Sequence, residues 1–138
     1  MPLTLSQIIP GINPSCQRLL ALYNQPQQLL TLLPARQGGD AAAMATLTLQ
    51  RLARQEPRDA RTLFARAKSA YGLNTEQTLA VEGSIARQFL LDKSGPERDW
   101  VDRVLRRQHD PALIELRLRQ AVWEADWRGV KTWVQRIP

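Results

Sequence analysis

Helix-capping residues recur along this chain at spacings that suit a series of short helices. Asn13 and Asp110 each stand directly before a proline, which is the favoured residue at the first helical position. Asp40 and Asp126 precede apolar-periodic stretches and are the expected caps of two further helices. A chain interrupted so regularly can form many short helices but no long one.

Two other stretches combine a capping residue with a partner three positions later. Asn74 is followed by Gln77, and Ser94 by Glu97, so both stretches resemble a capping box. Gly72, just before the first of them, can adopt the left-handed backbone that ends a helix. These signals predict a helix end near residue 72 and helix starts after residues 74 and 94.

Apolar residues between these signals follow the helical period. Ala60, Leu63, Phe64, Ala67 and Tyr71 form one stripe at i, i+3, i+4, i+7 and i+11. Similar seams are predicted later in the chain, and no convincing strand or hairpin pattern appears. The later seams are Trp100, Val101, Val104 and Leu105, and then Trp127, Val130, Val134 and Ile137. The predicted helices are 14–23, 26–33, 40–54, 57–70, 75–91, 96–107, 111–124 and 127–136.

The predicted fold is all-α, a right-handed superhelix or α-solenoid of antiparallel helix pairs. Links of two to six residues suit antiparallel neighbours. Asp59 and Asp126 occupy similar places in their helices and are 67 residues apart, about twice the 34-residue period of two-helix repeats. We therefore expect degenerate, TPR-like repeats forming one superhelical segment over residues 1–138, with residues 1–24 as a less regular part.

The composition limits the kinds of functional site and membrane segment that the chain is expected to contain. With one cysteine, Cys16, and one histidine, His109, the chain has no internal disulfide framework, and neither a metal site nor a cofactor is expected. No apolar run approaches the roughly 18 residues of a membrane span, and residues 1–6 lack the pattern of an export signal.

Carboxylates are candidates for catalysis because glycan-cleaving enzymes depend on them. Glu82, inside the broadly apolar helix 75–91, is the acid that stands out, but a catalytic role for it is not favoured. Most other acids have a local basic partner, and three have an arginine four residues later, a spacing that supports helices. The expected ion pairs are Asp99 with Arg103, Asp102 with Arg106, and Glu115 with Arg119.

Nineteen basic residues against thirteen acidic ones give a net charge of +6. A cationic face could bind an anionic polymer, although a merely solvated face is the simpler alternative. Trp100, Trp127 and Trp133 are expected to pack between helices, whereas Trp123 is expected to be exposed. The predicted binding face consists of Arg103, Arg106, Arg107, Arg117 and Arg119.

The order and spacing of several short stretches resemble a known family. The stretches are 73–77, Trp100, 113–117, Arg128-Gly129, Thr132-Trp133 and 136–138. Over roughly residues 40–138 the chain is similar to the non-catalytic part of soluble lytic murein transglycosylases.

The resemblance implies a helical scaffold in a periplasmic enzyme that cleaves peptidoglycan, in Gram-negative bacteria, to a 1,6-anhydro product. The family's lysozyme-like catalytic domain uses one glutamic acid, followed by Gly-Leu-Met-Gln-like and Ala-Tyr-Asn-Ala-Gly-like motifs, and these motifs do not occur in the 138 residues. No catalytic residue is therefore assigned. The expected partners are peptidoglycan, through a parent enzyme, and a catalytic domain in that parent chain.

Two alternatives stay open at this point. One is an α-solenoid that binds a partner protein on its concave face. The other is a basic helical protein that binds nucleic acid, although no helix-turn-helix or exposed aromatic series supports it, and nucleic acid is not an expected partner.

Overall fold

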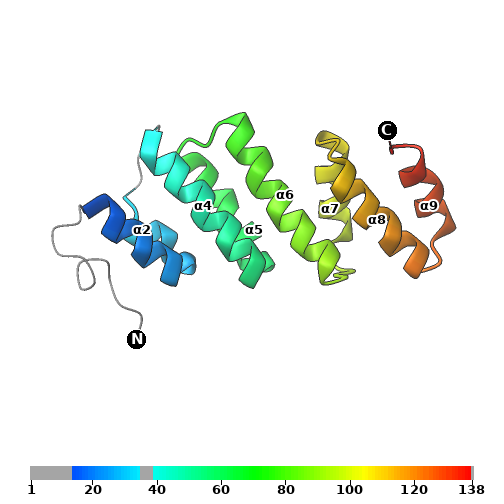
Figure 1. The fold of residues 1–138 in the computed structure, drawn as a ribbon, viewed down its shortest axis with the longest axis horizontal. Coiled ribbons are helices and arrows are strands. Elements are labelled where there is room, and N and C mark those ends of the chain that lie inside the picture. The colour runs from blue at the N-terminus through cyan, green and yellow to red at the C-terminus, as the bar shows by residue number, and fades with distance from the viewer. Residues whose placement is uncertain (1–13, 35–38, 138) are drawn as a thin grey trace. The chain divides into compact units, whose positions relative to one another are not determined.

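The computed structural model describes residues 14–34 and 39–137, and in these ranges every regular element is a helix (Figure 1). The prediction of an all-α chain is confirmed, whereas the solenoid form and its hand stay predictions. The elements are α2 (Pro14–Asn24), the 3-10 turn η1 (Pro26–Gln28), α3 (Leu29–Leu32), α4 (Gly39–Gln55), α5 (Pro57–Ala70), α6 (Thr75–Leu91), α7 (Arg98–Arg107), α8 (Pro111–Trp123) and α9 (Trp127–Val134).

These helices form two compact units, Met1–Val81 and Glu82–Pro138, and α6 contributes to both. In the first unit, α4 and α5 are joined by Glu56 alone and pack against each other as a helical hairpin. In the second unit, α8 and α9 form the corresponding hairpin. Among the described residues, no helix is both long and apolar enough to cross a membrane.

Tyr71, which follows α5, connects the end of that helix to the short helix α3. Its ring is fully buried, and its hydroxyl donates to the backbone carbonyl of Leu33 at 2.8 Å, with the carbonyl of Leu29 at 3.2 Å. Burial raises the pKa of the Tyr71 hydroxyl above its ordinary value of 10.0. The apolar stripe predicted for this helix is the buried face, since Ala60, Phe64 and Ala67 are buried as well.

The second unit has its own apolar core. Val101, Val104 and Leu105 of α7 are buried, as are Ile114 of α8 and Trp133 of α9. Phe89 and Trp100 meet edge to face, with ring centroids 5.9 Å apart and planes at 86°. The prediction of packing between helices is confirmed for Trp133, which is buried, and for Trp100, which is half-buried against Phe89 of α6.

Three of the predicted caps are present. Asn74 and Gln77 form a reciprocal capping box, with Gln77 N donating to Asn74 Oδ1 at 2.7 Å and Asn74 N donating to Gln77 Oε1 at 3.0 Å. Asp110 accepts from the backbone N–H of Ala112 at 2.9 Å, and Asp126 from that of Gly129 at 3.1 Å. Asp40 lies within the first turn, because α4 begins at Gly39, and Asn13 lies outside the described residues.

The prediction that Ser94 caps the next helix is wrong. α7 begins at Arg98, four residues later, and its cap residue Glu97 makes no side-chain capping bond. Ser94 instead closes α6, because its N–H donates to the carbonyl of Phe89 at 3.0 Å, while Lys93 adopts the left-handed conformation with φ 55°. This Schellman motif ends α6, and α7 begins only after a turn in which the N–H of Arg98 donates to the carbonyl of Gly95 at 3.1 Å.

The apolar seam predicted for the last helix is also wrong. Trp127, Val134 and Ile137 are exposed, and α9 packs through Trp133 instead. Gly129 lies close to both the capping residue and α8, since a Cβ added there would lie 2.5 Å from Asp126 Oδ2 and 3.3 Å from Ala121 Cβ. Trp133 lies one turn after Gly129 and fills the same face.

We expect Tyr71→Phe to lower the free energy of unfolding by about 1–3 kcal/mol, because the buried carbonyl of Leu33 loses its donor. Because the folded-state pKa of Tyr71 is raised, the unfolded chain loses this proton first, so wild-type stability is full below pH 10 and falls as pH rises above it. Denaturant titrations by circular dichroism at neutral and alkaline pH measure both effects. If the stability of Tyr71→Phe falls above pH 10 as steeply as that of the wild type, the pH dependence does not come from Tyr71.

Ala125 also lies in the left-handed region, with φ 55°, and its Schellman bond joins Asp126 N to Ala121 O at 2.9 Å. Ala125→Gly should raise the free energy of unfolding by roughly 0.5–1 kcal/mol, because glycine removes the steric cost of this conformation. The matched control, Ala65→Gly in the exposed interior of α5, should lower it by about 1 kcal/mol. The denaturant midpoint at constant m-value measures both.

Candidate functional site

A basic hollow of about 490 Å³ lies on α7 in the second unit, lined by Trp100, Arg103, Arg106 and Arg107. The three arginines are exposed and Trp100 is half-buried. Their spacing of i, i+3, i+6 and i+7 places all four on one side of the helix, opposite the buried Val101, Val104 and Leu105. The opposite face must be apolar to hold α7 in place, so the basic residues are directed to solvent.

Arg107, which lines this hollow, forms an ion pair with an acid. Its guanidinium donates to Glu82, whose side chain is 6 % exposed while that of Arg107 is 59 % exposed. The acid singled out for possible catalysis is therefore covered and bound to an arginine, with no open approach for a substrate. Glu82 instead anchors Arg107 at the rim of the hollow.

Arg103 and Arg106 are different. Neither makes an ion pair within the part of the chain that the structure describes, and the undescribed residues contain no Asp or Glu. The pairs predicted with Asp99 and Asp102 are absent from the described ranges, so those predictions are wrong. Two unneutralised guanidinium groups, one turn apart, give the hollow its positive potential.

Asp102, which was expected to pair with Arg106, pairs with Arg117 instead. The Nε of Arg117 donates to Asp102 Oδ1 at 2.7 Å, and the arginine side chain is only 3 % exposed. Its Cζ lies 5.6 Å from the centroid of the Trp133 ring. The prediction that Arg117 belongs to an exposed cationic face is wrong, because a helix-to-helix contact with Asp102 is available that the local i, i+4 spacing does not reveal.

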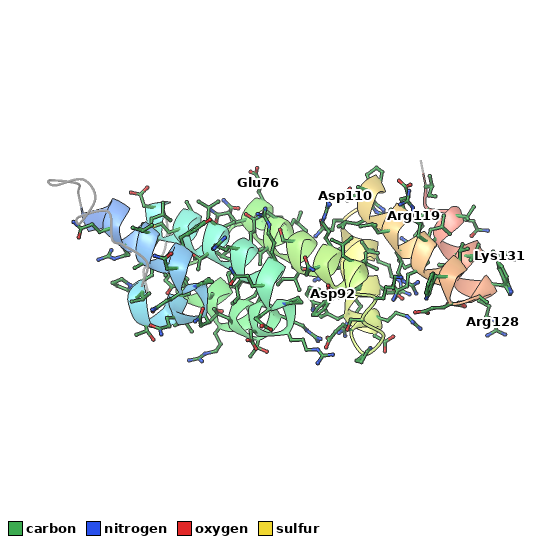
Figure 2. All side chains as sticks on the ribbon, turned by 60° about the horizontal axis from the view of Figure 1, so that its bottom comes forward. Glu76, Asp92, Asp110, Arg119, Arg128 and Lys131 are labelled. Atoms are coloured by element: carbon green, nitrogen blue, oxygen red, sulfur yellow. The ribbon has the colours of Figure 1, made fainter. Side chains whose placement is uncertain are left out.

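The fifth predicted residue, Arg119, is exposed on α8 and pairs with Glu115 at 2.7 Å, as expected (Figure 2). Trp123 lies further along the same helix and is 72 % exposed, which confirms its predicted exposure. Lys93 Nζ lies 3.7 Å from the centroid of its ring. The prediction that Trp127 packs inside is wrong, because Trp127 is exposed. Arg119 and Trp123 therefore mark a second exposed surface of mixed charge.

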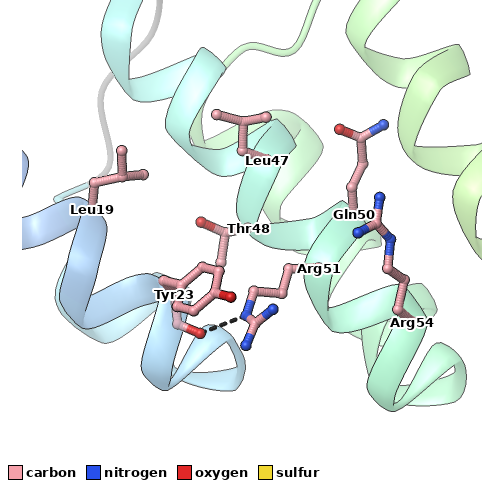
Figure 3. A pocket seen from close by; sticks show the side chains of 7 residues that line it. All are labelled: Leu19, Tyr23, Leu47, Thr48, Gln50, Arg51 and Arg54. Carbon is pink, nitrogen blue, oxygen red and sulfur yellow. Dashed lines mark hydrogen bonds between the residues drawn. The ribbon is translucent and has the colours of Figure 1, made fainter. Parts of the chain in front are cut away.

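The first unit holds a pocket that the sequence reasoning missed, a cavity of about 300 Å³ between α2 and α4 (Figure 3). Its walls combine exposed apolar side chains with two arginines at i, i+3 on α4. The signal in the sequence was a stripe of Leu47, Arg51 and Arg54 with no acid at helical spacing. The lining residues are Leu19, Tyr23, Leu47, Thr48, Gln50, Arg51 and Arg54.

The remaining candidates contribute no site. His109 is exposed in the link before α8, and the side chain of Cys16 lies outside the described residues. Among the residues whose placement is described, no group of three or more His, Cys, Asp or Glu side chains is arranged to hold a metal ion.

Comparison with known proteins relates most of this chain to one kind of enzyme, although no protein-family model matches it. It is 30 % identical over 122 residues to a soluble lytic murein transglycosylase of Salmonella typhimurium and 29 % identical over 122 residues to that of Escherichia coli K12. Each match covers 87 % of this chain and 19 % of the relative.

The crystal structure of the 70 kDa soluble lytic transglycosylase of Escherichia coli is similar in fold. It matches with a TM-score of 0.75 and 29 % identity, over 86 % of this chain and 20 % of that one. The chain therefore spans about a fifth of the length of the proteins it resembles.

We expect Asp102→Ala to lower the free energy of unfolding by about 3 kcal/mol, because Arg117 would be left buried without its counter-charge. Arg106→Ala should change it by less than about 0.5 kcal/mol, because Arg106 is exposed and unpaired. Denaturant titration of the two variants beside the wild type separates the observed pairing from the pairing expected from spacing. Equal losses in both variants would contradict the structure.

Proposed function

We propose that this chain, which is homologous to a helical segment of the soluble lytic murein transglycosylases, serves as a non-catalytic scaffold. In this proposal it frames or holds peptidoglycan while a separate domain of a parent enzyme cleaves the glycan strand to a 1,6-anhydro product. The setting would be the periplasm. The observation that carries the proposal is the homology over 122 residues, supported by the similarity of the helical fold.

Three of the acids are already engaged by arginines, and this favours a scaffold role over a cleaving one. A general acid for glycoside cleavage must reach the leaving oxygen of a bound glycan. Glu82 is covered and bound to Arg107, Asp102 is bound to buried Arg117, and Glu115 is bound to Arg119. Each of these acids stabilises a helix or a helix-to-helix contact.

The basic hollow suggests how the scaffold would meet its polymer. The peptide stems of peptidoglycan carry carboxylates, and guanidinium groups bind carboxylates through paired N–H donors. Arg103 and Arg106 are exposed and have no ion pair within the described ranges, so they can accept such a contact without breaking an existing one. Arg107, whose charge is compensated by Glu82, and Arg119, which is bound to Glu115 on the second exposed surface, would contribute less to this contact.

We expect the 138-residue chain to be retained by purified murein sacculi at moderate salt. The double variant Arg103→Gln/Arg106→Gln should be retained roughly threefold to tenfold less, because two exposed charge contacts of about 0.3–0.7 kcal/mol each are lost. The matched control is Arg66→Gln/Lys68→Gln on the exposed side of α5, which removes the same charge. Sedimentation of sacculi with quantified bound protein measures the difference.

Failure of the wild-type chain to bind sacculi would overturn the proposed contact with peptidoglycan. An equal loss in both double variants would show that net charge alone drives retention and would remove the hollow from the proposal.

A further inference from the structure

The pocket between α2 and α4 gathers exposed apolar side chains at one place. Leu19, Tyr23 and Leu47 are 40 %, 55 % and 57 % exposed, and all three line the same 300 Å³ cavity (Figure 3). Single exposed apolar residues are ordinary on a protein surface, but a concave cluster of them indicates a binding surface. All seven lining residues belong to the first unit.

Arg51 is held in place beside this apolar surface. Its Nε donates to the backbone carbonyl of Tyr23 at 2.6 Å, and its Cζ lies 3.5 Å from the centroid of the Tyr23 ring. Within the described residues, no hydrogen bond engages its two terminal nitrogens, Nη1 and Nη2. A guanidinium fixed at one edge and open at the other is preorganised to receive an anion, because less side-chain freedom is lost on binding.

The charges around the pocket have one sign. Its lining contains two arginines, Arg51 and Arg54, and no acid. Neither arginine makes an ion pair in the described ranges, unlike Arg98, Arg107 and Arg119, which all do. The undescribed residues offer no Asp or Glu to neutralise them. The pocket therefore combines an apolar floor with uncompensated positive charge.

We propose that this pocket binds a small monocarboxylate with an apolar body, a short acyl or aryl carboxylic acid. The carboxylate meets the open Nη edge of Arg51 within the field of Arg54. The hydrocarbon part lies on Leu19, Tyr23 and Leu47. The cavity volume is at the lower end of the range for ligand pockets, about 300–1,000 Å³, so one aromatic ring or a short chain fills it.

The probe is 4-phenylbutyrate, with the neutral 4-phenylbutanamide as its matched control, titrated into the 138-residue chain and followed by ¹H–¹⁵N NMR. We expect saturable shifts confined to residues of α2 and α4, and binding of the amide at least roughly tenfold weaker, because the amide lacks the charge that Arg51 engages. Comparable affinity for acid and amide would overturn the proposal.

Variants locate the site. Arg51→Gln and Leu47→Asp should each weaken binding of 4-phenylbutyrate roughly tenfold, the first by removing the anion's partner and the second by placing a like charge on the apolar floor. Leu47 is exposed, so Leu47→Asp tests the pocket even if Arg51→Gln loosens the packing of α2. Arg66→Gln, which removes a charge outside the pocket, should leave the affinity unchanged.

Two outcomes would each overturn the proposal. If the wild-type chain self-associates in sedimentation velocity and Leu47→Asp makes it monomeric, the pocket is an interface between two copies. If shifts on adding 4-phenylbutyrate fall outside α2 and α4, or are the same in all three variants, the pocket does not bind the carboxylate.

Discussion

Burial of one apolar row per helix is the constraint on which this structure depends. Isolated helices shorter than about 12–15 residues are marginal in water, and α7 and α9 have only 10 and 8 residues. Each persists because its apolar row is covered, through Val101, Val104 and Leu105 in α7 and Trp133 in α9. In α7 the polar side is consequently left for solvent, which is why its basic residues gather on one surface.

The arginines of the second unit divide into two groups by their partners. Arg117 and Arg107 are joined to acids of other helices, Asp102 and Glu82, and so connect elements of the unit. A buried ion pair such as that of Arg117 with Asp102 contributes little net stability, but losing one member is costly, so the pair fixes which helices meet. Arg103 and Arg106 make no ion pair in the described ranges, so their charge is available to a ligand.

The helices could be predicted from the sequence because their signals are local. Proline at the first position, the capping box of Asn74 and the left-handed Gly72 act within four residues, and the structure places helix boundaries within about two residues of the prediction. Ser94 was assigned wrongly because the spacing of Ser94 and Glu97 matches a capping box, although α7 begins only at Arg98. α6 is ended by Lys93, which adopts the left-handed conformation although it is not glycine.

The sites were harder to predict because they depend on contacts between helices. Local spacing assigned Asp102 to Arg106, whereas packing of α7 against α8 brought it to Arg117 and removed that arginine from the surface. The same reason hid the pocket of the first unit, where Tyr23 and Arg51 are 28 residues apart and meet only after α2 and α4 pack. An exposed i, i+4 ion pair stabilises a helix by about 0.2–0.5 kcal/mol. A buried arginine gains more stabilisation from a counter-charge than an exposed arginine does. In an arginine-rich helical chain, ion pairs between helices decide which arginines stay unpaired at the surface. The surface charge can therefore be assigned only once those pairs are known.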